Sequence, residues 1–163
     1  MRNLLKSFFY AFRGIGHCIC SERNMRIHLC FTVYMFGFLT VFDFFEVSRG
    51  QAAILIALCA LVMSLEAVNT AVENAVDLAT DKQHELARIA KDSAAGAVLI
   101  AALASVAAGI AVLWQPDAFR AMFAYYAQNI PVLIVLIISI ILSLVFIFAG
   151  PVKIKEFFIR GKK

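Results

Sequence analysis

The chain of 163 residues is 63% hydrophobic and 16% charged, and its formal net charge is +4. Its mean hydropathy of +0.86 is too high for an ordinary soluble domain and excludes that class. Long apolar segments instead predict an all-α integral membrane fold, because a helix satisfies its own backbone hydrogen bonds inside a bilayer. We expect no nucleic-acid partner for this protein.

The first 20 residues combine basic residues with apolar side chains at helical spacing. The apolar positions are Leu4, Leu5, Phe8, Phe9 and Phe12. Arg2, Lys6 and Arg13 lie between or beside them. This pattern is typical of an amphipathic helix that lies on the inner surface of a membrane. A disordered basic leader is the alternative interpretation.

Four later segments are apolar over about 20 residues, the length that a helix needs to cross a bilayer. They are residues 27–45, 52–75, 93–114 and 130–152, and Gly150-Pro151 ends the last of them. Residues 115–129 form either a short interfacial helix or a loop. We predict a membrane domain over residues 1–114 and an extension over 115–163 that holds the fourth span and a basic tail.

Lys and Arg residues cluster at three places in the chain. All of the fifteen except Arg49 and Arg120 lie before residue 27, between residues 77 and 92, or after residue 152. Basic residues are enriched in cytoplasmic loops, so these three segments are predicted to face the cytoplasm. We therefore expect a multi-pass protein of the bacterial inner membrane with a cytoplasmic N-terminus.

An acidic face interrupts the second apolar segment at its cytoplasmic end. Glu66, Asn69, Glu73 and Asp77 are three, four and four residues apart, so a helix places them on one side. Charged groups in or at the edge of a bilayer are costly and usually mark a functional site.

The residue types at this site suit phosphoryl transfer to a lipid alcohol. Carboxylates bind Mg²⁺ together with substrate phosphates, lysines offset phosphoryl charge, and a further carboxylate can accept a hydroxyl proton. The chain lacks GxxxxGK[ST], which excludes a P-loop kinase. A proton- or cation-conducting path and a non-catalytic membrane scaffold remain as alternatives.

Three motifs resemble those of one family. EAVNTAVENAVD, from Glu66 to Asp77, resembles the core motif E-x-x-N-[ST]-A-[IV]-E-x-x-[VI]-D of the small prokaryotic diacylglycerol kinases. HEL at 84–86 and AKDSAAGAVLI at 90–100 are similar to later motifs of that family. ERNMRIH at 22–28 is similar to a segment of its Gram-positive members, which are mainly undecaprenol kinases. The resemblance covers about residues 5–114 and places the chain nearest to that branch.

The resemblance implies a fold and an activity. The fold is an integral-membrane homotrimer with a surface helix, three spans in each subunit, and active sites shared between neighbouring subunits. The activity is that of a lipid kinase that depends on ATP and Mg²⁺ and transfers the γ-phosphoryl group to a lipid hydroxyl on the cytoplasmic side. The Gram-positive segment favours undecaprenol as the acceptor, with diacylglycerol as the alternative.

The resemblance also implies roles for individual residues. Glu66 matches the general base, and Asn69 matches an amide near the acceptor hydroxyl. Lys91 meets phosphate oxygens. Glu22 and Glu73 hold the metal ions of the nucleotide. The residues that contact or order the nucleotide are Tyr10, Glu22, Glu73, Asp77, His84, Lys91 and Asp92.

Two features depart from the family pattern. Lys82 and Gln83 stand where the enterobacterial branch tends to have an acidic and an aromatic residue. The family's usual chain ends near Trp114, so the resemblance implies no role for residues 115–163.

Overall fold

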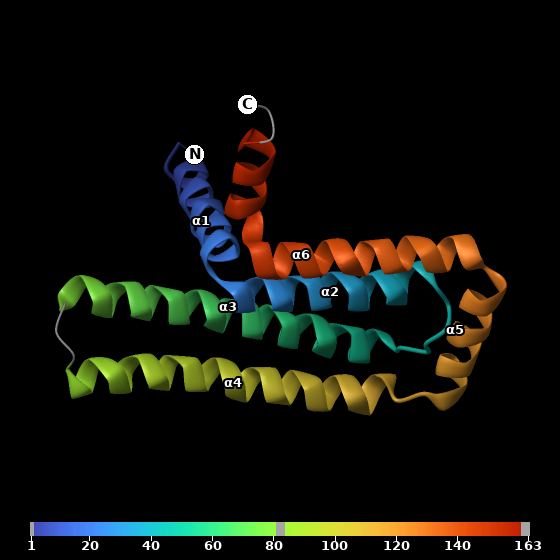
Figure 1. The fold of residues 1–163 in the computed structure, drawn as a ribbon. Helices are drawn as coiled ribbons and strands as arrows, with labels where there is room; N and C mark the ends of the chain where they lie inside the picture. The colour runs from blue at the N-terminus through green and yellow to red at the C-terminus, as the bar shows by residue number, and fades with distance from the viewer. Residues whose placement is uncertain (1, 81–83, 161–163) are drawn as a thin grey trace.

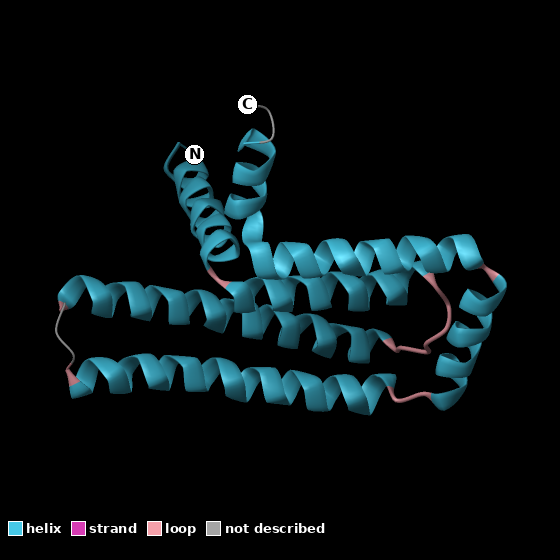
Figure 2. Ribbon diagram, viewed as in Figure 1, coloured by secondary structure: helices cyan, strands magenta, loops and turns pink. Residues whose placement is uncertain are grey.

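The computed structural model describes residues 2–80 and 84–160, and it is helical throughout apart from short connections (Figures 1 and 2). Lys82 and Gln83 lie outside the described residues. The helices are α1 (Arg2–Ser21), α2 (Arg23–Val41), α3 (Arg49–Ala79), α4 (Glu85–Leu113), α5 (Pro116–Gln128) and α6 (Ile130–Arg160). The predicted all-α class is therefore confirmed.

The long helices lie side by side in a bundle (Figure 1). α3 packs against α4, and α2 contacts α3 on one side and α6 on the other. α1 and the last part of α6 emerge from the bundle together and contact each other. At that end, α3 and α4 extend beyond the start of α2 (Figure 1).

Three helices in the described chain are long and apolar enough to cross a membrane by length and composition. They are Arg49–Ala79, Glu85–Leu113 and Ile130–Glu156, and they correspond to the second, third and fourth predicted spans. The first predicted span, over residues 27–45, differs from the structure, in which α2 begins at Arg23 and ends at Val41. Because its first turn includes Arg23 and Arg26, α2 is more polar than α3, α4 and α6.

Small and branched residues hold α3 and α4 together. Val62 of α3 packs with Val98 and Ala101 of α4 in a buried cluster, which Leu65 and Ala102 extend. Small side chains allow two helix backbones to approach closely, and in a membrane such packing replaces the hydrophobic effect as the main source of helix association.

Residues 115–129 form a helix and not a loop. α5 starts at Pro116, whose fixed φ and missing N–H suit the first helical position. Gln115 ties this corner to the α2–α3 connection, because its side chain accepts from the Glu46 N–H and donates to the Glu46 carbonyl, both at 3.0 Å. Burial, followed by the neighbouring Tyr125, raises the pKa of Tyr126, which therefore stays uncharged at neutral pH.

Candidate active site

The acidic face of α3 runs from the interior of the bundle to its surface. Glu66 is only 2% exposed, and Asn69 is also buried. Glu73 is half-buried, and Asp77 is exposed. The helical spacing therefore places the four side chains in a row that passes from a water-poor to a water-rich environment.

The corner between α1 and α2 supplies the second part of the site. Glu22 separates the two helices and has an extended backbone, with φ −96° and ψ 122°. Its carboxylate interacts electrostatically with that of Glu66, as does the carboxylate of Glu73. The Asn24 side chain hydrogen-bonds the Glu66 carboxyl group. Glu22 and Glu66, 44 positions apart in the sequence, are thus brought into one site.

Asn69 connects the buried and exposed parts of the α3 face. Its Nδ2 donates to Glu73 Oε1 at 2.9 Å. Its Oδ1 is buried and has no hydrogen-bond partner among the described residues. A buried acceptor without a donor is costly. This atom is therefore available to a donor such as the hydroxyl group of a bound molecule.

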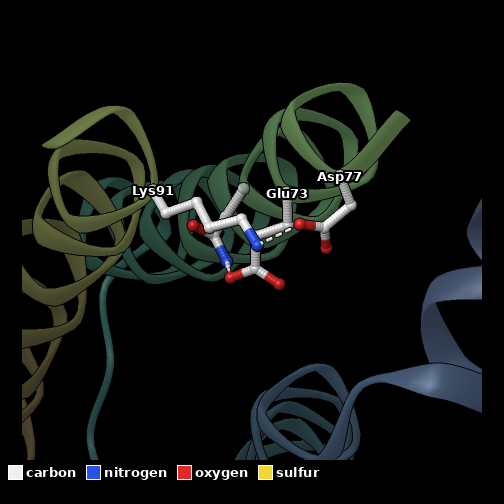
Figure 3. A network of polar contacts seen from close by, with 4 residues as sticks. Glu73, Asp77 and Lys91 are labelled. Carbon is white, nitrogen blue, oxygen red and sulfur yellow. Dashed lines mark hydrogen bonds and ion pairs between the residues drawn. The ribbon is translucent and has the colours of Figure 1, made fainter. Parts of the chain in front are cut away.

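Lys91 reaches from α4 to the acidic face. Its Nζ lies 2.5 Å from Asp77 Oδ1, and Figure 3 shows these two side chains pointing toward each other beside Glu73. The side chain of Lys91 is 35% exposed and that of Asp77 is 66% exposed. An ion pair in this setting is weak, so Lys91 can exchange Asp77 for another anion at little cost.

Three residues expected to contact a nucleotide have other partners in this chain. Tyr10 is exposed on α1, and the Arg13 guanidinium lies 5.4 Å from the centre of its ring. His84 is the N-cap of α4, and its Nδ1 accepts from the Leu86 N–H at 3.2 Å. Asp92 pairs with Arg88 one turn earlier, at 3.2 Å. The contacts described for these three residues do not join them to the Glu66 cluster.

The sequence prediction gave no role to two residues near this site. Asn24 bonds the candidate base directly, and Arg26 is buried next to the corner that holds Glu22. Both belong to the ERNMRIH segment. Their position beside Glu22, at the inner end of the first predicted span, was the signal for them in the sequence.

The donor set fits a metal ion that is bound together with a substrate. Among the described residues, no group of three or more His, Cys, Asp or Glu side chains could hold a metal ion alone. Glu22 and Glu73 both lie near Glu66. Mg²⁺ needs only one or two protein carboxylates when waters and phosphates complete its octahedron, and Glu22 and Glu73 offer ligands of this type.

Known proteins resemble the part of the chain that holds this site. Residues 9–113 match the family profile of prokaryotic diacylglycerol kinases, and every predicted site residue lies within that range. The diacylglycerol kinase of Synechocystis is 44% identical over 115 residues, which cover 70% of this chain and 64% of that relative. The undecaprenol kinase of Bacillus subtilis is 40% identical over 114 residues, 69% of this chain and 89% of the relative.

A more distant relative has the same family name. The diacylglycerol kinase of Pseudomonas aeruginosa is 33% identical over 101 residues, which cover 62% of this chain and 80% of the relative. The chain spans slightly less than two thirds of the Synechocystis relative and most of the other two. The profile match over more than half of the chain shows that this multi-pass membrane protein belongs to the prokaryotic diacylglycerol kinase family, whose named members are lipid kinases.

Proposed function

We propose that the protein is a lipid kinase that uses ATP and Mg²⁺ to phosphorylate undecaprenol. One observation carries the proposal: a buried carboxylate, Glu66, lies on the same face of α3 as Asn69, whose carbonyl oxygen has no donor among the described residues, and as Asp77, which pairs with Lys91 of α4. This arrangement offers a base and an acceptor for a hydroxyl group at the dry end, and a cation for phosphate at the wet end.

In the proposed mechanism, the lipid hydroxyl binds between Asn69 and Glu66. Asn69 Oδ1 accepts a hydrogen bond from the hydroxyl and orients it, and Glu66 then takes the proton as the oxygen attacks the γ-phosphorus. A positioned general base of this kind accelerates a reaction by about 10²–10⁴-fold. Asn24 supports the orientation of Glu66 through its hydrogen bond to the carboxyl group.

The nucleotide binds at the exposed end of the same face. Lys91 exchanges Asp77 for phosphate oxygens and offsets the charge that moves during transfer. Glu22 and Glu73 are the proposed protein ligands of Mg²⁺, which when bound neutralises the ATP phosphates and holds them in place. Tyr10, His84 and Asp92 are proposed to contact the nucleotide.

An apolar cavity supports a lipid as the acceptor. It has a volume of about 420 Å³ and lies between α2, α3, α4 and α5. Its lining includes Ile27 and Val62 at one end and Trp114 at the other. Val62 is one helical turn before Glu66, so a hydrocarbon chain in this cavity would bring its polar head to the acidic face.

The proposal includes an assembly and an orientation. We place the protein in the bacterial cytoplasmic membrane as a homotrimer with shared active sites, with the N-terminus and the site on the cytoplasmic side. α2 is the remaining crossing, because it lies between α3 and α6. Residues 1–114 form the kinase domain, and residues 115–163 form an extension.

One assay tests the proposed function. Purified protein is incubated with ATP and Mg²⁺ and either undecaprenol or diacylglycerol, and the lipid products are identified by mass spectrometry. We expect undecaprenyl phosphate to form at the higher rate. The name of the Synechocystis relative makes diacylglycerol the second candidate acceptor. If neither phosphorylated lipid formed, and the protein carried cations into liposomes that lack ATP, the kinase proposal would be refuted. That result would favour a conducting protein.

A further inference from the structure

The C-terminal helix contains a break that leaves one carbonyl without its usual donor. In an uninterrupted helix, the Ile147 carbonyl would accept from the N–H of residue 151, but Pro151 has no N–H. Gly150 has φ 71° and ψ 160°, a backbone conformation that is essentially restricted to glycine. The residues that follow turn away from the bundle and run beside α1 (Figure 1).

Arg26 of α2 supplies the missing donor. Its Nε donates to the Ile147 carbonyl at 3.0 Å. Its Nη1 donates to the carbonyls of Ile19 and Cys20, also at 3.0 Å. The last carbonyls of a helix have no intrahelical donors and carry the negative end of its dipole. One guanidinium therefore joins the C-terminal turn of α1 to the break in α6.

This contact, which we call the Arg26 clasp, is tightly enclosed. Arg26 is 6% exposed, and it forms no ion pair with a described acidic residue. A Cβ atom at position 150 would lie 3.3 Å from Cζ and Nη1 of Arg26. Gly150 is therefore needed both for its φ and for the close approach of the guanidinium.

The clasp also fixes the corner that holds Glu22. Glu22 follows the last residue of α1, and its N–H donates to the Cys18 carbonyl at 2.8 Å. The Arg26 N–H donates in turn to the Glu22 carbonyl at 3.4 Å. Glu22 thus lies at the junction between α1, whose last carbonyls the Arg26 side chain binds, and α2, which carries Arg26.

We propose that Arg26 is a positioning residue through which α6 sets the location of Glu22. The inference rests on the proposed kinase function, in which Glu22 binds Mg·ATP. It assigns a role to the extension, which lies beyond the residues 9–113 that match the family profile. α6 touches neither substrate in this account and acts only by holding the α1–α2 corner.

The first test uses Pro151→Ala, which leaves Arg26 in place. The new N–H competes for the Ile147 carbonyl and favours a straight helix, so the clasp weakens. We expect the KM for Mg·ATP to rise roughly tenfold, the scale of losing a charge-assisted hydrogen bond, while the KM for the lipid stays unchanged. Arg26→Gln should give a larger effect, and Arg26→Lys should recover part of it.

Tyr34→Phe is the matched control. The Tyr34 hydroxyl donates to Ser139 Oγ at 2.9 Å and lies 3.1 Å from Ser143 Oγ, so it joins α2 to α6 away from the corner. We expect this variant to keep the wild-type KM for Mg·ATP. An equal rise in Tyr34→Phe and Pro151→Ala would mean that any loosening of α6 has the same effect, and it would overturn the inference.

A second readout does not depend on activity. Cys18 is buried near the end of α1, whereas Cys20 is exposed. In a background with Cys20, Cys30 and Cys59 changed to Ser, maleimide should label Cys18 faster in Pro151→Ala than in the unchanged chain. If the wild-type protein were active, and Pro151→Ala changed neither the labelling of Cys18 nor the KM for Mg·ATP, this inference alone would be refuted. If the wild-type protein had no kinase activity, the proposed function would be refuted. Unaltered labelling of Cys18 in Pro151→Ala would still refute the role of the clasp in holding the α1–α2 corner.

Discussion

At the scale of single residues, the site depends on the contrast between Glu66 and its neighbours along the same helix face. Glu66 is almost fully buried, whereas Asp77, three turns further on, is exposed. A carboxylate that is removed from water binds its remaining partners more strongly, because the surrounding dielectric is low. Glu66 is thus suited to proton transfer, and Asp77 to exchange with solvent and charged ligands.

Glu66→Gln should reduce lipid phosphorylation by about 10²–10⁴-fold, because the amide cannot accept the hydroxyl proton. The two side chains have nearly the same shape, so the thermal transition of the purified protein should change little. Glu46→Gln, at the opposite end of the bundle, is the control and should keep full activity. Turnover of Glu66→Gln within a few-fold of wild type would exclude the assignment of Glu66 as the base.

Lys91→Gln should lower kcat without loss of stability. The Lys91–Asp77 pair is partly exposed, and such pairs contribute at most about 1 kcal/mol to the free energy of unfolding. The control is Arg88→Gln, which removes an exposed pair with Asp92 on the same helix. Steady-state kinetics and thermal denaturation measured together test this prediction; if both variants had the same kcat as wild type, Lys91 would have no role in transfer.

At the scale of helices, local spacing predicted much of the fold and of the site. Helical periodicity places Glu66, Asn69 and Glu73 on one face, and apolar length identifies three of the spans, because both depend only on neighbouring residues. The Arg26 clasp joins residues 121 positions apart, and the approach of Glu22 to Glu66 requires two helices to pack. No periodic pattern encodes such contacts. The first span was predicted four residues too far along the chain, because the apolar composition continues to Phe45 after α2 has ended at Val41.

Gly150→Ala should destabilise the protein by about 1–3 kcal/mol. The substitution places a side chain in a backbone region that only glycine readily adopts, and its Cβ would press on the Arg26 guanidinium. Gly37→Ala is the control, because no described atom lies within 4 Å of a Cβ built there and alanine is the better helix former. Thermal unfolding in detergent measures both. Equal transition temperatures for Gly150→Ala and wild type would contradict the strained fit at the break.

At the scale of the whole molecule, the distribution of charge predicts the orientation in the membrane. We expect a cysteine introduced as Glu46→Cys to react with a membrane-impermeant maleimide in intact cells. Native Cys20 is exposed in the structure and should react only after the cells are opened. The reverse pattern of labelling would place the candidate site on the outer side, away from cellular ATP.

The side-by-side course of α1 and the last part of α6 has a practical consequence for assembly. α1 and the last part of α6 lie side by side (Figure 1), and the proposed four crossings place both of them on the same side of the membrane. Copies of the gene can therefore be fused in tandem through short linkers, without an added crossing. A single-chain form of the proposed trimer made in this way could carry one altered copy at a chosen position. Its activity would report directly which subunits contribute residues to each catalytic centre.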